Sequence, residues 1–259
     1  MRVLRTVVQL IFFAGVVALM ARGLAGATPN TCETYCPFAG LVALYPLIRH
    51  QTYTCALNEL HVALFISLVG LTVISKKSFC SWVCPLGTVQ EWLWRLNRRI
   101  FGRTVRMPHA LDRALIPLRY VVLAAVLGMT WTIWQGDLGF RAYDPFYIIF
   151  TGFQGHELMA FSVFIAVGIL AVAYFVPYFW CRYLCPLGAV MDPLSRAGLL
   201  RLRRVWSVCT DCGKCDEACP HAIPVSEVTE LTARNCTNCL ECVDACPEAG
   251  ALELTILGK

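Results

Sequence analysis

Cysteines near the C-terminus form two motifs that can hold iron-sulfur clusters. Both read C-x2-C-x2-C-x3-C-P, over residues 209–220 and 236–247. In this bacterial ferredoxin pattern, three closely spaced thiolates bind one 4Fe-4S cluster and the fourth, just before proline, binds the other. Zinc, which also accepts four thiolates, is the alternative. The pattern therefore predicts two ligand sets: Cys209, Cys212, Cys215 and Cys246 for the first cluster, and Cys219, Cys236, Cys239 and Cys242 for the second.

A different motif, C-x3-C-P, occurs at Cys80/Cys84 and at Cys181/Cys185. Residues four apart share one helical face, so each pair offers two ligands but does not complete a site. Residues 79–87 and 180–188 both follow the pattern aromatic-Cys-x-aromatic-x-Cys-Pro-Leu-Gly. Such a repeat predicts two pseudo-symmetric halves. We expect the halves to bring the four thiols together around a third iron-sulfur cluster; the alternative is buried free thiols.

A third C-x3-C-P motif, Cys32/Cys36, falls in a segment predicted to face the periplasm or exterior, together with Cys55. A disulfide is the usual state of such cysteines in an oxidising compartment, although four-residue spacing in a regular helix suits it poorly. The alternative is a redox or metal site that includes Asp144, which takes the place of Cys36 in the repeated sequence Tyr-x-Pro-Phe. Both interpretations stay open.

Polar residues near the outer helix ends offer a candidate site for a quinone and its protons. Ionisable residues close to membrane helices are often functional, although helix ends also carry them for solvation alone. The candidates are His61, Asp144, His156 and Glu157.

The elements that position these residues are apolar. Hydrophobic residues make up 58% of the 259-residue chain and charged residues 15%, against about 25% charged in an ordinary soluble domain. Four uncharged runs, residues 6–21, 60–75, 120–136 and 158–181, approach the length of about 20 residues that a bilayer requires. A signal peptide is the alternative for the first run. Two shorter apolar stretches, 41–48 and 146–153, are predicted to be re-entrant or interfacial.

Charge placement predicts how the chain is oriented. Residues 76–114 carry eight Lys and Arg, whereas residues 25–59 and 137–157 carry one each. Because cytoplasmic loops are enriched in Lys and Arg, the amino terminus, residues 76–114 and everything after residue 181 are predicted to be cytoplasmic. Residues 92–106 are basic and amphipathic, which is typical of a helix on an anionic leaflet. The net charge of +5 therefore indicates membrane lipid rather than nucleic acid as the partner.

The predicted fold is a membrane all-α bundle with a small α+β dicluster ferredoxin domain. The bundle has four transmembrane helices in two pseudo-symmetric halves with re-entrant outer segments, over residues 1–200. The ferredoxin domain covers residues 201–259 and carries both C-x2-C-x2-C-x3-C-P motifs.

These motifs together resemble the NapH/NosR-type membrane polyferredoxins, over nearly the whole chain. The resemblance implies a multi-pass protein of the cell inner membrane, a quinol dehydrogenase subunit that takes electrons from quinol. It passes them through 4Fe-4S clusters to a redox protein partner, ferredoxin-like or cytochrome c-like. We expect no large outer flavin-binding domain of the NosR kind, which departs from that part of the resemblance. Two alternatives are a conduit from a cytoplasmic donor to an outer partner without quinone chemistry, and a redox-sensing or assembly protein.

Overall fold

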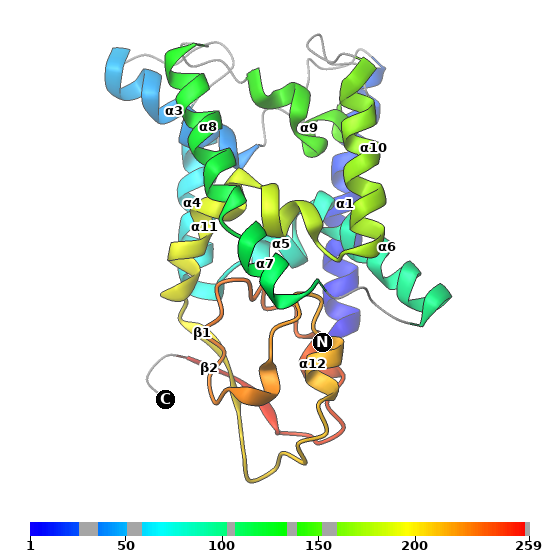
Figure 1. The fold of residues 1–259 in the computed structure, drawn as a ribbon. Helices are drawn as coiled ribbons and strands as arrows, with labels where there is room; N and C mark the ends of the chain where they lie inside the picture. The colour runs from blue at the N-terminus through cyan, green and yellow to red at the C-terminus, as the bar shows by residue number, and fades with distance from the viewer. Residues whose placement is uncertain (26–35, 51–58, 103–106, 134–138, 152–159, 257–259) are drawn as a thin grey trace.

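The computed structural model describes residues 1–25, 36–50, 59–102, 107–133, 139–151 and 160–256. Helices dominate the chain up to residue 196, and a small domain with two strands follows (Figure 1). The amino terminus lies beside this C-terminal domain, so the first helix begins at the junction between the two parts.

A helix occupies each of the four predicted apolar runs: α1 (Arg2–Leu24), α4 (Glu59–Ser75), α8 (Leu118–Thr132) and α10 (Ala160–Phe175). Two stretches, Arg2–Leu24 and Ala110–Thr132, are helical, long and apolar enough to cross a membrane. α4 and α10 are also apolar but have only 17 and 16 residues.

The predicted helix over residues 158–181 is wrong at its C-terminal end. α10 ends at Phe175, two residues before Pro177. Proline has no N–H to donate to the preceding turn, and its ring clashes with a helical carbonyl. Tyr178 then takes a left-handed conformation with φ of 55°. The helix stops there, and a separate turn carries Cys181.

The predicted repeat is visible in the order of elements. The first half contains α3 (Pro37–His50), α4, α5 (Ser78–Trp82) and α6 (Pro85–Phe101). The second contains α9 (Pro145–Phe150), α10, η2 (Trp180–Leu184) and α11 (Pro186–Arg196). The connecting segment holds α7 (His109–Leu115), α8 and η1 (Gly139–Tyr143). α3 and α9 lie in the half of the bundle remote from the C-terminal domain (Figure 1).

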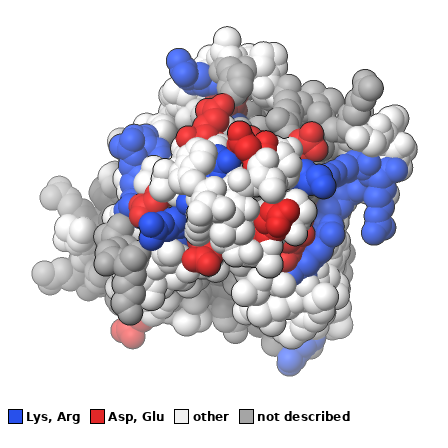
Figure 2. All heavy atoms as spheres, turned by 90° about the horizontal axis from the view of Figure 1, so that it is seen from below, with Lys and Arg blue, Asp and Glu red and all other residues white. Residues whose placement is uncertain are grey.

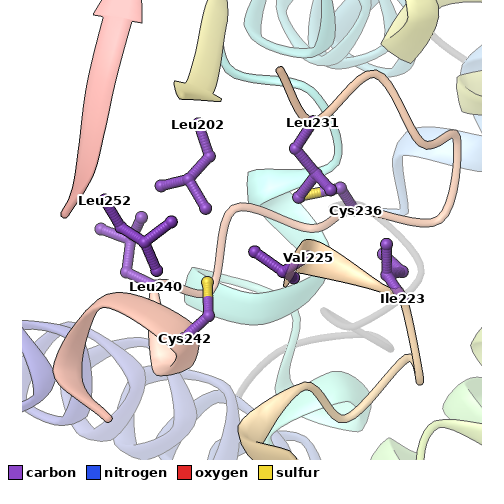
Figure 3. Close-up of a cluster of buried hydrophobic side chains, with 8 residues drawn as sticks. All are labelled: Leu202, Ile223, Val225, Leu231, Cys236, Leu240, Cys242 and Leu252. Carbon is purple, nitrogen blue, oxygen red and sulfur yellow. The ribbon is translucent and has the colours of Figure 1, made fainter. Parts of the chain in front are cut away.

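The C-terminal domain is built on an antiparallel pair of strands. β1 (Leu200–Arg204) pairs with β2 (Leu252–Ile256), with Leu202 opposite Leu254. Between them the chain forms only short helices: α12 (Lys214–Ala218), η3 (Val225–Glu227) and α13 (Glu241–Asp244). Its apolar core contains two cysteines among branched side chains (Figure 3): Leu202, Ile223, Val225, Leu231, Cys236, Leu240, Cys242 and Leu252.

Two buried carboxylates inside the helical part each form ion pairs with two cationic side chains. Asp192 of α11 is fully buried and pairs with Lys77 and Arg119, while Tyr120 donates to it at 2.8 Å. Glu91 of α6, 1% exposed, pairs with the buried Arg5 and with Arg95. Charges buried to this degree persist only when paired. These groups tie α1, α6, α8 and α11 together.

Candidate iron-sulfur sites

The first predicted ferredoxin quartet surrounds one small cavity of about 20 Å³ in the C-terminal domain. Its lining includes Cys209, Cys212, Cys215 and Cys246. Arg204 of β1 also lines it and donates from Nε to Cys209 Sγ at 3.1 Å. A hydrogen bond from a cation to a cluster sulfur is one of the ways a protein raises a reduction potential.

The second quartet surrounds a neighbouring cavity of similar volume, about 20 Å³. Cys219 joins Cys236, Cys239 and Cys242 in its lining, as the crossed ligand assignment requires. Burial raises the pKa of the Cys239 thiol to about 12, and burial raises that of Cys215 in the first quartet to about 11. Without iron these thiols are protonated at neutral pH, so binding iron must release their protons.

The loops that carry the two quartets have left-handed residues at corresponding positions. Asp211 and Gly213 take positive φ in the first loop, at 56° and 69°, and Asn238 and Leu240 do so in the second, at 46° and 61°. Left-handed residues let a short loop turn back on itself, at a cost for any residue other than glycine. The repeated signature therefore indicates that both loops are shaped around the same kind of ligand.

The thiol arrangement suits a cluster better than one ion. Within the described residues, no three His, Cys, Asp or Glu side chains are grouped to hold a single metal ion. A cubane distributes its four thiolates over four iron atoms, so its cysteines stand around a cavity and not at one point. All eight cysteines of the two quartets are free thiols available as ligands.

A third and much larger cavity lies within the helical part, with a volume of about 780 Å³. We call it the thiol cavity. It is lined by all four cysteines of the two predicted C-x3-C-P pairs, Cys80, Cys84, Cys181 and Cys185. Apolar side chains of α1 and α4 form much of the remaining wall. The repeat therefore brings together the residues that sequence reasoning expected it to bring together.

The two C-x3-C-P turns have the same local geometry, which explains why their thiols face one cavity. Cys84 caps α6 with φ, ψ of −66° and 117°, and Cys185 caps α11 with −66° and 116°. Proline follows each cysteine as the first helical residue, where its missing N–H costs nothing. The N–H of Cys84 donates to Phe79 O at 2.9 Å, and that of Cys185 to Trp180 O at 2.8 Å.

The glycine after each Cys-Pro-Leu permits this turn. A Cβ on Gly87 would clash with the backbone carbonyl of Cys80, whereas one on Gly188 would meet the Cys181 carbonyl at 3.1 Å. We expect Gly87→Ala to destabilise the protein by about 3 kcal/mol and Gly188→Ala by about 1 kcal/mol, since overpacking against backbone costs this much. Thermal unfolding checks this, with Gly128→Ala as the control because its Cβ meets nothing within 4 Å. Equal effects of the first two changes would contradict the prediction.

Cys36 and Asp144 line the same thiol cavity. Cys36 is a free thiol directly before Pro37 at the start of α3. Asp144 caps α9, and its side chain accepts a hydrogen bond from Phe146 N at 3.0 Å. The sequence predicts that Cys36 belongs to an outer site apart from the other C-x3-C-P cysteines, whereas in the structure it lines the same cavity as they do.

Of the remaining candidate residues, the structure describes only His61. His61 is buried in α4, 2% exposed, and is not among the residues that line the thiol cavity. Cys32, Cys55, His156 and Glu157 lie outside the described residues. Of the predicted quinone and proton site, Asp144 alone among the described residues reaches the cavity wall.

Gln90 of α6 is a site residue that the sequence analysis missed. It is fully buried, its Nε2 donates to Cys181 Sγ at 3.2 Å, and its Oε1 accepts from Trp180 N at 3.2 Å. A side chain from the first half thus holds a cysteine of the second half. The available signal was a glutamine in the first turns of a helix that follows a Cys-Pro pair.

Four residues connect the thiol cavity to the second quartet, and we call them the polar bridge: Ser81, Trp82, Thr237 and Asn238. Ser81 Oγ donates to Thr237 O at 2.8 Å, and Trp82 Nε1 donates to Asn238 O at 3.0 Å. Ser81 directly follows Cys80, and Thr237 directly follows Cys236. A path from a thiol-cavity cysteine to a ferredoxin cysteine therefore crosses only one hydrogen bond.

Comparisons with known proteins identify 4Fe-4S domains in the regions that contain these cysteines. The family model described as a 4Fe-4S binding domain matches twice, over residues 60–104 and 158–207, which contain the two C-x3-C-P pairs. A 4Fe-4S dicluster domain model matches residues 201–248. The chain is 34% identical to YccM of Escherichia coli over 238 residues, which are 89% of this chain and 65% of that protein. No solved structure is significantly similar.

Two further relatives carry names that describe their type. The ferredoxin-type protein NapH of Haemophilus influenzae is 27% identical over 191 residues, 68% of this chain and 60% of that protein. The regulatory protein NosR of Pseudomonas aeruginosa is 29% identical over 151 residues, 58% of this chain and 21% of that protein. The chain thus spans less than two thirds of YccM, NapH and NosR. It belongs to the NapH/NosR-type polyferredoxin family, ferredoxin-type electron transport proteins with 4Fe-4S domains.

Proposed function

We propose that this chain oxidises quinol at the thiol cavity and passes the electrons through its 4Fe-4S clusters to a respiratory redox partner. The observation that carries this proposal is the polar bridge, which joins the wall of an apolar cavity to a ferredoxin quartet through one hydrogen bond. A 4Fe-4S cluster bound by a ferredoxin quartet would take up and release one electron at a time. The protein's own contribution is to position and tune such groups.

Three cluster sites follow from the cysteine arrangement. The two quartets of the C-terminal domain would hold one 4Fe-4S cluster each. Cys80, Cys84, Cys181 and Cys185 would hold the third iron-sulfur cluster between the two halves. Support for the third comes from the matching turns of the two pairs and from Gln90, whose hydrogen bond to Cys181 crosses between the halves.

The helical part would sit in the cell inner membrane with four crossing helices, and with its amino terminus and ferredoxin domain in the cytoplasm. Support comes from the apolar side chains that α1, α4 and α10 expose, among them Ile11, Ile66 and Phe164, each at least 63% exposed. Exposed apolar surface of this extent on a helix bundle is typical of contact with lipid.

Quinol would enter the thiol cavity from the lipid between α1 and α4. The wall there is apolar, with Phe12, Leu64 and Leu68 among its residues, which suits the ring and tail of a quinone. Oxidation of quinol to quinone releases two electrons and two protons. The electrons would leave singly through the polar bridge. The carboxylate of Asp144 would accept the two hydroxyl protons in turn, releasing the first to the outer aqueous phase before it takes up the second.

Asp144→Asn tests this proton role. We expect quinol to reduce the clusters about a hundredfold more slowly in this variant, the scale of a lost general base, while dithionite reduces them at the normal rate. The full chain in lipid nanodiscs is mixed anaerobically with decylubiquinol, and the loss of visible cluster absorbance is recorded. Glu227→Gln, an exposed acid on η3, is the control. Failure of quinol to reduce the unmodified protein would overturn the proposal.

A second candidate is a transmembrane electron conduit that uses no quinone. Its support is Cys36, a fifth thiol on the wall of the thiol cavity, at the start of the helix that leads away from the C-terminal domain. The same nanodisc experiment separates the two: a conduit is reduced by a soluble low-potential donor but not by decylubiquinol.

A further inference from the structure

A groove with a volume of about 830 Å³ lies between α1, α6 and the C-terminal domain. We call it the arginine groove. Its walls include Arg2 of α1, Trp94 and Arg98 of α6, and Asp244 just after the second ferredoxin loop. The elements that line it, α1, α6, α12 and α13, include the helix α6 that projects to one side of the molecule in Figure 1. The groove is separate from all three cysteine cavities.

The groove is lined by buried hydrogen-bond donors that lack acceptors. Trp94 is only 2% exposed, and its indole Nε1 has no hydrogen-bond partner among the described residues. Nε of Arg95, which also lines the groove, is buried and equally unpartnered within the described chain. A buried donor without an acceptor costs about 1–3 kcal/mol. Such a site is completed by a ligand rich in acceptor oxygens.

The excess positive charge of the groove favours an anionic ligand. Arg2, Arg98 and Arg99 are exposed, and none of them forms a salt bridge with a carboxylate among the described residues. Arg2 does interact electrostatically with Glu241, whose pKa it helps to lower. The two acids of the groove are already paired: Glu241 with Arg5 and Arg95 at 2.5 and 2.6 Å, and Asp244 with the amino terminus at 3.5 Å. Figure 2 shows a broad Lys/Arg surface at the side where α6 lies.

Apolar side chains beside the arginines favour a lipid over a free anion. α6 exposes Leu96, Ile100 and Phe101 by 48%, 60% and 61%. Leu96 and Trp92 line the groove itself. A basic, amphipathic helix at this level would place acyl chains along these residues while its arginines face the headgroup.

We propose that the arginine groove binds an anionic phospholipid, with the phosphate beside Trp94 Nε1 and Arg95 Nε and the acyl chains along α6. This inference rests on the membrane placement in the proposed function, but not on quinol oxidation. Because α1, α6 and the loop after α13 all contribute, a bound lipid would hold the C-terminal domain against the helical part.

Native mass spectrometry of the full chain in detergent tests this. Dioleoylphosphatidylglycerol and dioleoylphosphatidylcholine are titrated separately, and inorganic phosphate is added as a competitor. We expect the unmodified protein to prefer phosphatidylglycerol. Arg98→Gln with Arg99→Gln should weaken phosphatidylglycerol binding about twentyfold, since each arginine near an anionic lipid contributes about fivefold.

Two further variants sharpen the test. Arg196→Gln with Arg203→Gln removes the same charge from exposed positions outside the groove and should leave lipid binding unchanged. Trp94→Phe keeps the aromatic ring, removes the donor and should weaken binding without changing iron content. Equal affinity of the Arg98/Arg99 variant and the unmodified protein would overturn the proposal. So would equal affinity for the two lipids, or saturation by inorganic phosphate, which would identify a free phosphate site. Loss of quinol reduction with lipid preference intact would refute the proposed function alone.

Discussion

Replacing Cys80 and Cys181 together by serine should lower the iron content from about twelve to about eight atoms per chain, counting four per cluster. One cysteine is removed from each half, so neither half can supply its pair of ligands to the third site. The two ferredoxin quartets share no cysteine with the thiol cavity, so their eight irons should remain. Iron and acid-labile sulfide are measured on anaerobically purified protein, with paramagnetic resonance of the reduced state.

Cys36→Ser is the matched comparison, because Cys36 lines the same cavity but lies outside the repeated pairs. If the four repeated cysteines are the complete ligand set, this variant keeps about twelve irons. A loss of four irons would instead add Cys36 to the ligands. About eight irons in the unmodified protein would contradict a third cluster altogether and leave the C-x3-C-P turns with a structural role.

Asp192→Asn should destabilise the folded protein by about 3–5 kcal/mol, the scale for breaking a buried ion pair from one side. The amide removes the charge that balances Lys77 and Arg119, which lie 4% and 1% exposed. Two uncompensated cations would then remain in a dry site. The expected fall in melting temperature is about 6–20 °C for a chain of this size, measured by the change in tryptophan fluorescence on heating in detergent.

Glu230→Gln is the control for this change. Glu230 pairs with Arg201 at 3.3 Å, but its side chain is 45% exposed. A solvent-exposed ion pair contributes about 1 kcal/mol or less, so the control should melt close to the unmodified protein. A melting temperature for Asp192→Asn within a degree or two of the control would show that the buried charges are not a stabilising unit.

The local patterns of cysteine and proline were enough to predict where potential ligands meet. Spacing alone predicted that Cys219 would join Cys236 and Cys239, and that Cys246 would join Cys209, because the proline after the fourth cysteine turns it away from its own loop. The repeated Cys-Pro-Leu-Gly turn predicted that Cys84 and Cys185 would converge. These patterns can be recognised in a sequence because each turn is determined by a few neighbouring residues.

Features that depend on distant partners were not predictable from sequence. In the sequence, Arg5 is simply a basic residue near the amino terminus. In the structure its side chain is buried against Glu91 and Glu241, which follow it by 86 and 236 positions. Nothing in the sequence marks Ser81 as a contact residue. Its role is visible only in the structure, where it donates a hydrogen bond to Thr237 O. Helix length was also overestimated for residues 158–181, because hydropathy continues past Pro177 while helical hydrogen bonding cannot.

Anaerobic quinol reduction, followed by paramagnetic resonance, determines whether electrons enter at the thiol cavity and reach the C-terminal domain. Decylubiquinol is mixed with the unmodified protein and with the Cys80→Ser, Cys181→Ser variant, both in nanodiscs, with dithionite as the reference reductant. We expect quinol to produce the ferredoxin-domain signals in the unmodified protein only, while dithionite produces them in both. Equally fast quinol reduction of the two proteins would contradict this expectation, as would no reduction by quinol in either.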